Sequence, residues 1–178
     1  KGVHAGMVMA KASTLFEVMS RDQVDPDEMM FHMNNDLFIT KTSGMFVTCV
    51  LGKYDLVSDE ITWVNGGHQP AIIRNQQGEY QNFDSEAPPM GVISLKDKSI
   101  YKINKQVLNG NKFYVFTDGL SESLDVEGKE IGIDGSIKII EDNYTKDSKK
   151  HLSDVTKKII KISGSEKLSD DLTLISIG

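Results

Sequence analysis

Two kinds of apolar spacing divide this chain of 178 residues. Apolar residues recur at helical intervals near the N-terminus, which predicts a helix over residues 3–19. The run from Asp25 to Glu28 predicts the start of a second helix that extends to about residue 38. Asp25 can cap that helix, Pro26 suits its first position, and Glu28 can complete a capping box.

The middle of the chain changes to short runs rich in Val, Ile, Thr and aromatic residues, which predict strands. The predicted strands cover residues 45–54, 61–64, 71–74, 79–83, 100–108, 112–116 and 172–177, and further helices are predicted over 133–144 and 152–162. Asn109-Gly110 predicts a hairpin between two of these strands. Strands joined by tight hairpins pair antiparallel, so the pattern predicts an α+β fold rather than a Rossmann-type sheet.

Composition narrows the functional classes. The net charge of −6 argues against a nucleic-acid binder, and no apolar run approaches the ~20 residues that cross a bilayer. The start of the chain shows no signal-peptide pattern, and a single cysteine, Cys49, fits a reducing cytoplasm. The sequence opens on Lys1 and runs directly into an apolar periodic segment, which predicts a piece of a longer protein, such as the cytoplasmic part of a sensor.

Several catalytic chemistries lack their motifs. Cys49 is not followed by an anion-binding loop with a nearby Arg, so we expect a packed core residue and not a nucleophile. No Walker phosphate loop or nucleophile elbow occurs, and the four histidines show no zinc-ligand spacing. His68 could be a catalytic histidine, but the preferred interpretation is a structural turn residue behind Gly66 and Gly67.

Two acidic positions lie at the ends of predicted strands. Asp118-Gly119 follows the strand over residues 112–116, and Asp170-Asp171 precedes the last strand. Carboxylates on a rigid scaffold suit Mg²⁺ or Mn²⁺, and paired metals can activate water for attack on phosphorus. Asp-Gly is also a common turn and Asp a common cap, so the residues permit a metal-assisted hydrolase without requiring one.

Five short blocks follow one another along the chain: Lys1-Gly2-Val3-His4-Ala5 with residues 7–10, Trp63 to Pro70, Ala87-Pro88-Pro89-Met90-Gly91, Phe113 to Ser123, and Ser169-Asp170-Asp171-Leu172-Thr173. In this order they resemble the SpoIIE/RsbU-type phosphatases, the bacterial stress-response and sporulation branch of the protein phosphatase 2C (PPM) superfamily. Together they cover nearly the whole chain. The resemblance implies a single phosphatase domain over residues 1–178, incomplete at its N-terminus, with helices flanking a mainly antiparallel β-sandwich that lacks its first strands.

The resemblance also implies a site. It assigns Asp118 and Asp170 as ligands of one shared Mn²⁺ or Mg²⁺, with Gly119 and Asp171 in support, and a two-metal site in the parent domain. The implied nucleophile is a metal-activated water, so no side chain is a catalytic nucleophile. The family's bridging aspartate stands four residues before the position of Lys1, and a second acidic ligand lies further upstream. With only two carboxylates, we expect weak metal binding.

The activity implied by the resemblance is hydrolysis of phosphoserine or phosphothreonine on a protein. The implied substrate is a phosphorylated STAS-type anti-sigma-factor antagonist in cytoplasmic stress or sporulation signalling. Either the chain is a trimmed piece, or a second copy completes the sheet in a homodimer. Two alternatives stay open: a pseudophosphatase that signals by binding its partner, and a small binding module whose acidic turns are coincidental.

Overall fold

The structure is a computed structural model that describes residues 2–40, 44–164 and 170–178. The chain forms two compact units, one made of residues 1–70 with 84–109 and the other of residues 71–83 with 110–178. Each unit contains an antiparallel sheet and its own helices, which confirms the α+β fold class. Among the described residues, no helix combines the length and the apolar character that a membrane crossing needs.

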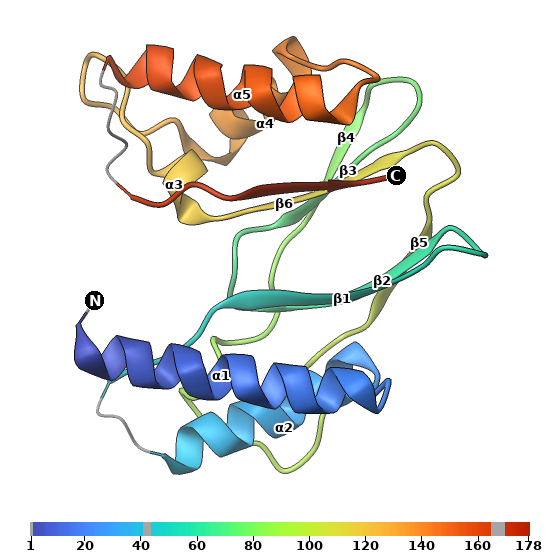
Figure 1. Ribbon diagram of the computed structural model, residues 1–178, viewed down its shortest axis with the longest axis vertical. Coiled ribbons are helices and arrows are strands. Elements are labelled where there is room, and N and C mark those ends of the chain that lie inside the picture. The colour runs from blue at the N-terminus through green and yellow to red at the C-terminus, as the bar shows by residue number, and fades with distance from the viewer. Residues whose placement is uncertain (1, 41–43, 165–169) are drawn as a thin grey trace. The chain divides into compact units, whose positions relative to one another are not determined.

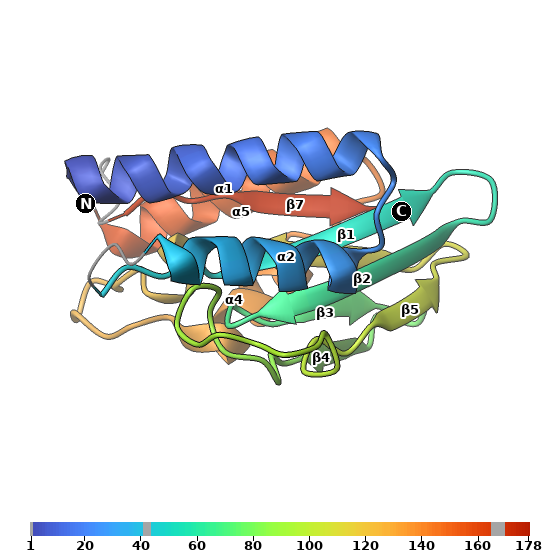
Figure 2. The ribbon, with the colours of Figure 1, turned by 90° about the horizontal axis from the view of Figure 1, so that it is seen from below.

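The first unit has a three-stranded sheet with two helices. Its elements are α1 (Val3–Arg21), α2 (Pro26–Ile39), β1 (Cys49–Asp55), β2 (Glu60–Gly66) and β5 (Asn104–Val107). The strand order is β1-β2-β5, and both pairings are antiparallel, with Leu51 opposite Val64. Helices α1 and α2 lie side by side in both views of the ribbon (Figures 1 and 2).

Helix α2 supplies most of the helical part of the first core. Its buried methionines contact apolar residues of the sheet and of the segment after residue 84, and the buried members of this cluster are Met29, Met30, Met33, Leu37, Leu51, Val64, Ala87, Met90 and Tyr101. Helix α1 contributes partly buried residues only, although its apolar spacing correctly predicted a helix. The burial of α2 therefore holds this helix on the sheet.

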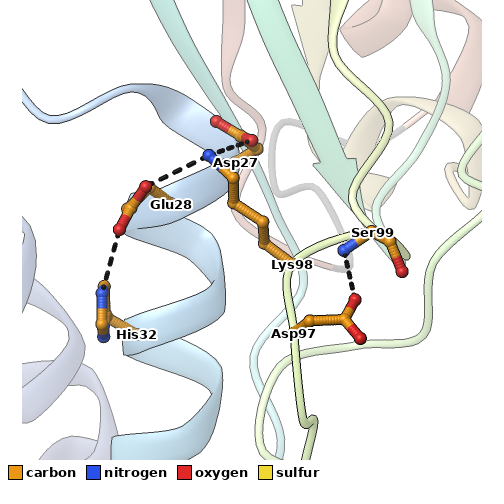
Figure 3. A network of polar contacts seen from close by, with 6 residues as sticks. All are labelled: Asp27, Glu28, His32, Asp97, Lys98 and Ser99. Carbon is orange, nitrogen blue, oxygen red and sulfur yellow. Dashed lines mark hydrogen bonds and ion pairs between the residues drawn. The ribbon is translucent and has the colours of Figure 1, made fainter.

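The predicted capping box at the start of α2 is not formed. Asp25 has the extended backbone of an N-cap, but its side chain makes no capping hydrogen bond. Glu28 instead pairs with Lys98 at 3.1 Å and with His32 at 3.5 Å, and Lys98 also reaches Asp27 at 2.8 Å (Figure 3). Glu28 thus pairs with Lys98, which is distant in sequence, instead of completing the local capping box with Asp25.

Two asparagines of α2 hold the segment that contains Lys98 against the helix. Asn34 is fully buried, accepts the amide of Gly91 at 2.9 Å and donates to the carbonyl of Ile93 at 3.0 Å. Asn35 accepts the amide of Leu95 at 2.9 Å and donates to the carbonyl of the same residue at 3.0 Å. These bonds satisfy backbone groups of a segment without regular structure.

The second unit has a four-stranded sheet with helices on one of its faces (Figure 1). Its elements are β3 (Ala71–Arg74), β4 (Tyr80–Phe83), β6 (Lys112–Phe116), α3 (Asp118–Ser121), α4 (Gly132–Asp142), α5 (Ser148–Ser163) and β7 (Leu174–Ile177). The strand order is β4-β3-β6-β7, and every pairing is antiparallel. Its core contains Ile72, Tyr114, Phe116, Leu120, Ile139, Ile140, Val155 and Ile159. The inner strand β6 is therefore paired with β3 and β7 and packs against helices α4 and α5.

The hairpin predicted at Asn109-Gly110 is wrong. Asn109 and Gly110 both have positive φ, as such a hairpin needs, but β5 pairs with β2 and β6 pairs with β3 and β7. Asp59 explains the difference, because its carbonyl accepts the amide of Leu108 at 2.8 Å and its carboxylate accepts the amide of Asn109 at 2.7 Å. These bonds continue the contact of β5 with the chain just before β2, so the end of β5 stays with the first sheet.

The other predicted elements are present with shifted ends. The strand predicted over residues 45–54 begins at Cys49, and the one predicted over 100–108 shortens to Asn104–Val107. The short helix α3 was not predicted, because four residues carry no periodicity. It begins at the candidate ligand Asp118, so the unpredicted element is the one that positions the site.

Candidate metal centre

Asp118 lies where the buried strand β6 changes into helix α3. Thr117 is the N-cap, with an extended backbone, and Asp118 is the first helical residue. Leu120, two positions later, is fully buried and anchors the turn in the core of the second unit. The Asp118 carbonyl accepts the amide of Glu122 at 2.7 Å, whereas its side chain is exposed. The strand and the turn thus present the carboxylate to solvent from a rigid base.

Asp170 and Asp171 lie in the turn before β7, and both are exposed. The Asp170 carboxylate accepts the amide of Asp171 at 2.9 Å, which orients one of its oxygens locally. Asp171 is tied to the site through its backbone carbonyl, as shown below. Ser169 of the same predicted block, like Lys1 of the first block, lies outside the described residues.

The two acidic turns are joined by Thr117. Its amide donates to the carbonyl of Thr173 at 3.0 Å, and its hydroxyl accepts the amide of Thr173 at 2.9 Å. The same hydroxyl donates to the carbonyl of Asp171 at 3.1 Å. The sequence indicated Thr117 only as part of the block from Phe113 to Ser123, with no role of its own. The available signal was its polar side chain at the end of an apolar strand, directly before Asp-Gly.

Gly119 is required by the close approach of the two turns. A Cβ atom added to Gly119 would lie 2.3 Å from the carbonyl oxygen of Asp171 and 2.8 Å from the carbonyl carbon. No side chain tolerates such a contact with backbone, so only glycine allows this separation. The structure thus gives a steric reason for glycine at position 119, and the supporting role assigned to Gly119 from the resemblance stays a prediction. Its carbonyl accepts the buried hydroxyl of Ser123 at 2.6 Å.

The chemistry of these residues fits a hard divalent cation. Asp118, Asp170 and Asp171 offer oxygen ligands only, and within the described ranges none of them forms an ion pair with a basic side chain. The number of ligands is small, because the described residues contain no cluster of three or more His, Cys, Asp or Glu side chains arranged to hold a metal. These residues suit Mg²⁺ or Mn²⁺ in kind, and their role as ligands stays a prediction.

The block from Trp63 to Pro70 forms a structural turn within the first unit. Asn65 accepts the amide of His68 at 2.9 Å and donates to the carbonyl of Gln69 at 3.0 Å. The His68 ring lies 3.1 Å from the hydroxyl of Thr48. Gly67 has φ of +69°, and a Cβ on it would lie 2.6 Å from Pro89, so this turn packs directly on the Pro-Pro segment. These contacts agree with the preferred interpretation of His68 as a turn residue.

Cys49 is the first residue of β1 and packs against the first core. Burial raises the pKa of its thiol to about 12. A thiol of such high pKa is almost entirely protonated at neutral pH, and the thiolate is the nucleophilic form. This environment agrees with the expectation that Cys49 is a packing residue and not a nucleophile.

The chain is similar in sequence and in structure to known bacterial phosphatases. The chain is 21% identical over 175 residues to the phosphoserine phosphatase RsbU of Bacillus subtilis, covering 98% of this chain and 51% of RsbU. In structure it matches the PP2C phosphatase domain of SpoIIE from Bacillus subtilis with a TM-score of 0.80 and 18% identity, over 99% of this chain and 50% of the other. The chain therefore spans about half the length of these relatives.

Two solved structures of the same fold were obtained with a divalent metal ion present or soaked in. RsbX in complex with magnesium matches with a TM-score of 0.66 and 19% identity, over 99% of this chain and 74% of the other. Crystals of the SpoIIE phosphatase domain soaked in manganese also match, with a TM-score of 0.61 and 18% identity. At these identities the likeness establishes the fold, which is that of PP2C-like domains.

The model of one family, stage II sporulation protein E (SpoIIE), matches this chain over all of residues 1–178. The match includes both acidic turns. The chain belongs to the SpoIIE family.

Proposed function

We propose that this chain is the phosphatase domain of a metal-dependent protein serine/threonine phosphatase. It hydrolyses phosphoserine or phosphothreonine on a protein substrate. One observation carries the proposal: Thr117 and Gly119 bring the turn of Asp118 against the turn of Asp170 and Asp171, in a chain that matches the SpoIIE family along its whole length. Exposed carboxylates at the joined ends of two paired strands are suited to a cation that also contacts phosphate.

Within this site, Asp118 and Asp170 would hold Mn²⁺ or Mg²⁺. A bound divalent cation supplies positive charge that activates water and stabilises the phosphoryl group. The chain's own residues hold the ligands: β6 and the buried Leu120 fix the turn of Asp118, and the amide of Asp171 orients the Asp170 carboxylate. The Asp171 side chain supports the site from beside the ligands. Cys49 takes no part, because burial keeps its thiol protonated.

The proposed substrate is a phosphorylated STAS-type anti-sigma-factor antagonist in the cytoplasm. The likeness to RsbU, which is named a phosphoserine phosphatase, supports a phosphorylated protein as the substrate class. A phosphorylated STAS-domain protein should lose its phosphate in the presence of this chain and Mn²⁺, as followed by phosphate-affinity electrophoresis. If the STAS-domain protein keeps its phosphate while a generic phosphate ester is hydrolysed, this substrate is rejected and the proposed phosphatase activity is retained. A homodimer, if formed, would appear as a doubled mass in light scattering.

The deciding experiment measures hydrolysis of p-nitrophenyl phosphate with and without Mn²⁺. It uses both the 178-residue chain and the same chain with its natural flanking sequence, each beside Asp118→Asn. We expect activity that requires Mn²⁺ and disappears in the Asp118→Asn variant. The small number of acidic ligands within the described residues keeps the pseudophosphatase as the second candidate. A folded protein with flanking sequence that binds its partner but hydrolyses neither ester nor phosphoprotein would favour that candidate.

A further inference from the structure

The end of strand β6 contains an unusual exchange of hydrogen-bond acceptors. Strands β6 and β7 pair up to Phe116 and Leu174, and the next pair in register is Thr117 with Thr173. The amide of Thr117 makes the expected bond to the carbonyl of Thr173. In an antiparallel ladder the return bond would run from the amide of Thr173 to the carbonyl of Thr117.

That carbonyl instead accepts the amide of Leu120 at 3.0 Å in the first turn of α3. The hydroxyl of Thr117 takes its place and accepts the amide of Thr173 at 2.9 Å. The same hydroxyl uses its proton to bond the carbonyl of Asp171 at 3.1 Å. One side chain therefore lets the chain turn into α3 while it continues the ladder toward the acidic turn.

We infer that Thr117 is a positioning residue for the metal ligands. Its hydroxyl holds the turn of Asp118 against the turn of Asp170 and Asp171, and this sets the separation of the carboxylates. The inference rests on the proposed function, because it assigns the cation to these carboxylates. The loss of a group that orients a metal ligand typically weakens metal binding about 10- to 100-fold.

The chemistry explains why this position needs a hydroxyl. The Thr117 side chain must accept one hydrogen bond and donate another to groups two residues apart on the facing turn. Serine and threonine can do both with a short side chain, and valine, which has the shape of threonine, can do neither. The branched Cβ of threonine also restricts the side-chain rotamer, so the hydroxyl is directed before the metal arrives.

The test compares three variants of the natural protein that contains this chain: Thr117→Val, Thr117→Ser and Thr156→Val. Thr156 is the matched control, because its hydroxyl bonds the carbonyl of Leu152 within α5, away from both acidic turns. Mn²⁺ affinity is measured by titration calorimetry, and hydrogen exchange of the Thr173 amide is measured by NMR without metal. If Thr117→Val fails to fold, Thr117→Ala replaces it, since alanine also removes the hydroxyl.

We expect Thr117→Val to weaken Mn²⁺ binding about 10- to 100-fold and to expose the Thr173 amide to exchange. Thr117→Ser should restore most of both properties, and Thr156→Val should change neither. A general loss of stability would not be rescued selectively by serine.

Unchanged Mn²⁺ affinity in a folded Thr117→Val would overturn the positioning role. An unchanged Thr173 amide would also overturn it, because the hydroxyl bond would then be absent in solution. If the unmodified protein binds no Mn²⁺ while Thr117→Val still exposes the Thr173 amide, the metal assignment of the proposed function is rejected and the hydroxyl link between the turns is supported.

Discussion

Gly119 and Asp171 approach so closely that a Cβ on Gly119 would lie 2.3 Å from the carbonyl oxygen of Asp171. The contact joins the turn after β6 to the turn before β7. The atoms that meet at this contact belong to the backbone of Asp171 and not to the end of a mobile side chain. The separation of the acidic turns is therefore sensitive to a single methyl group at position 119.

Gly119→Ala should destabilise the protein by about 1–3 kcal/mol and reduce Mn²⁺ affinity, because the added methyl forces the two turns apart. Urea unfolding and Mn²⁺ titration measure the two effects. Gly6→Ala is the control: a Cβ on Gly6 in α1 meets nothing within 4 Å, and alanine favours the helix. If Gly119→Ala matches the unmodified protein in both measurements, the close approach does not exist in solution.

Asp170 and Asp171 should respond differently to neutralisation. Asp170→Asn removes a proposed ligand and should lower Mn²⁺ affinity about tenfold or more, as the loss of a coordinating or orienting group does. Asp171→Asn should have a smaller effect, because the Asp171 carbonyl that Thr117 binds is retained. Titration calorimetry of the two variants makes the comparison. A larger loss in Asp171→Asn would exchange the roles assigned to these residues.

The ion pairs of Lys98 should stabilise the folded protein at neutral pH and less so in acid. The hydrogen bond and the charge of Lys98 lower the pKa of Glu28 below its usual value, and the pairing with Asp27 and Glu28 raises the pKa of Lys98. Because the pKa of Glu28 is lowered by folding, its contribution is present above the unfolded pKa of 4.5 and is lost as pH falls through the lower folded value. The raised pKa of Lys98 has the opposite consequence: its contribution is lost only at pH above 10.5.

The difference in melting temperature between the unmodified protein and Lys98→Met should therefore be present at pH 7 and shrink toward pH 3. Added salt should also shrink the difference, because the pair is exposed. Lys96→Met is the control on the same segment, since Lys96 takes part in no ion pair within the described residues. A difference that is equal at pH 7 and pH 3 would show that Lys98 acts by packing alone.

Cys49 should react slowly with thiol reagents while the protein is folded. With a pKa of about 12, the thiolate fraction at pH 8 is about 10⁻⁴, so both charge state and burial protect it. Ellman's reagent at pH 8, with and without urea, measures the reaction, and Cys49→Ala should keep the proposed phosphatase activity. Fast labelling of the folded protein, or loss of activity in a stable Cys49→Ala, would reopen a role for this thiol.

Much of the site could be predicted because its residues follow local rules. The strand ending at Phe116, the Asp-Gly after it and the Asp-Asp before the last strand all carry signals within a few residues. The role of Thr117 could not be predicted from spacing, because its two partners lie more than 50 positions away along the chain. The close contact of Gly119 likewise depends on a segment distant in sequence.

The sequence by itself determined the helices, most of the strands and the acidic residues at strand ends, because periodicity and turn residues act over neighbouring positions. Local turns also predicted that β1 pairs with β2 and β3 with β4. Tertiary structure decided the pairings between strands that are not consecutive in the chain, which are β2 with β5, β3 with β6 and β6 with β7. Asn109 and Gly110 have the local conformation of a hairpin, yet β5 and β6 lie in different sheets, and the bonds of Leu108 and Asn109 to Asp59 hold the end of β5 beside β2. It also decided that Glu28 pairs with Lys98 instead of capping α2, since a charged partner from a distant segment outcompetes a local bond once folding brings it within reach.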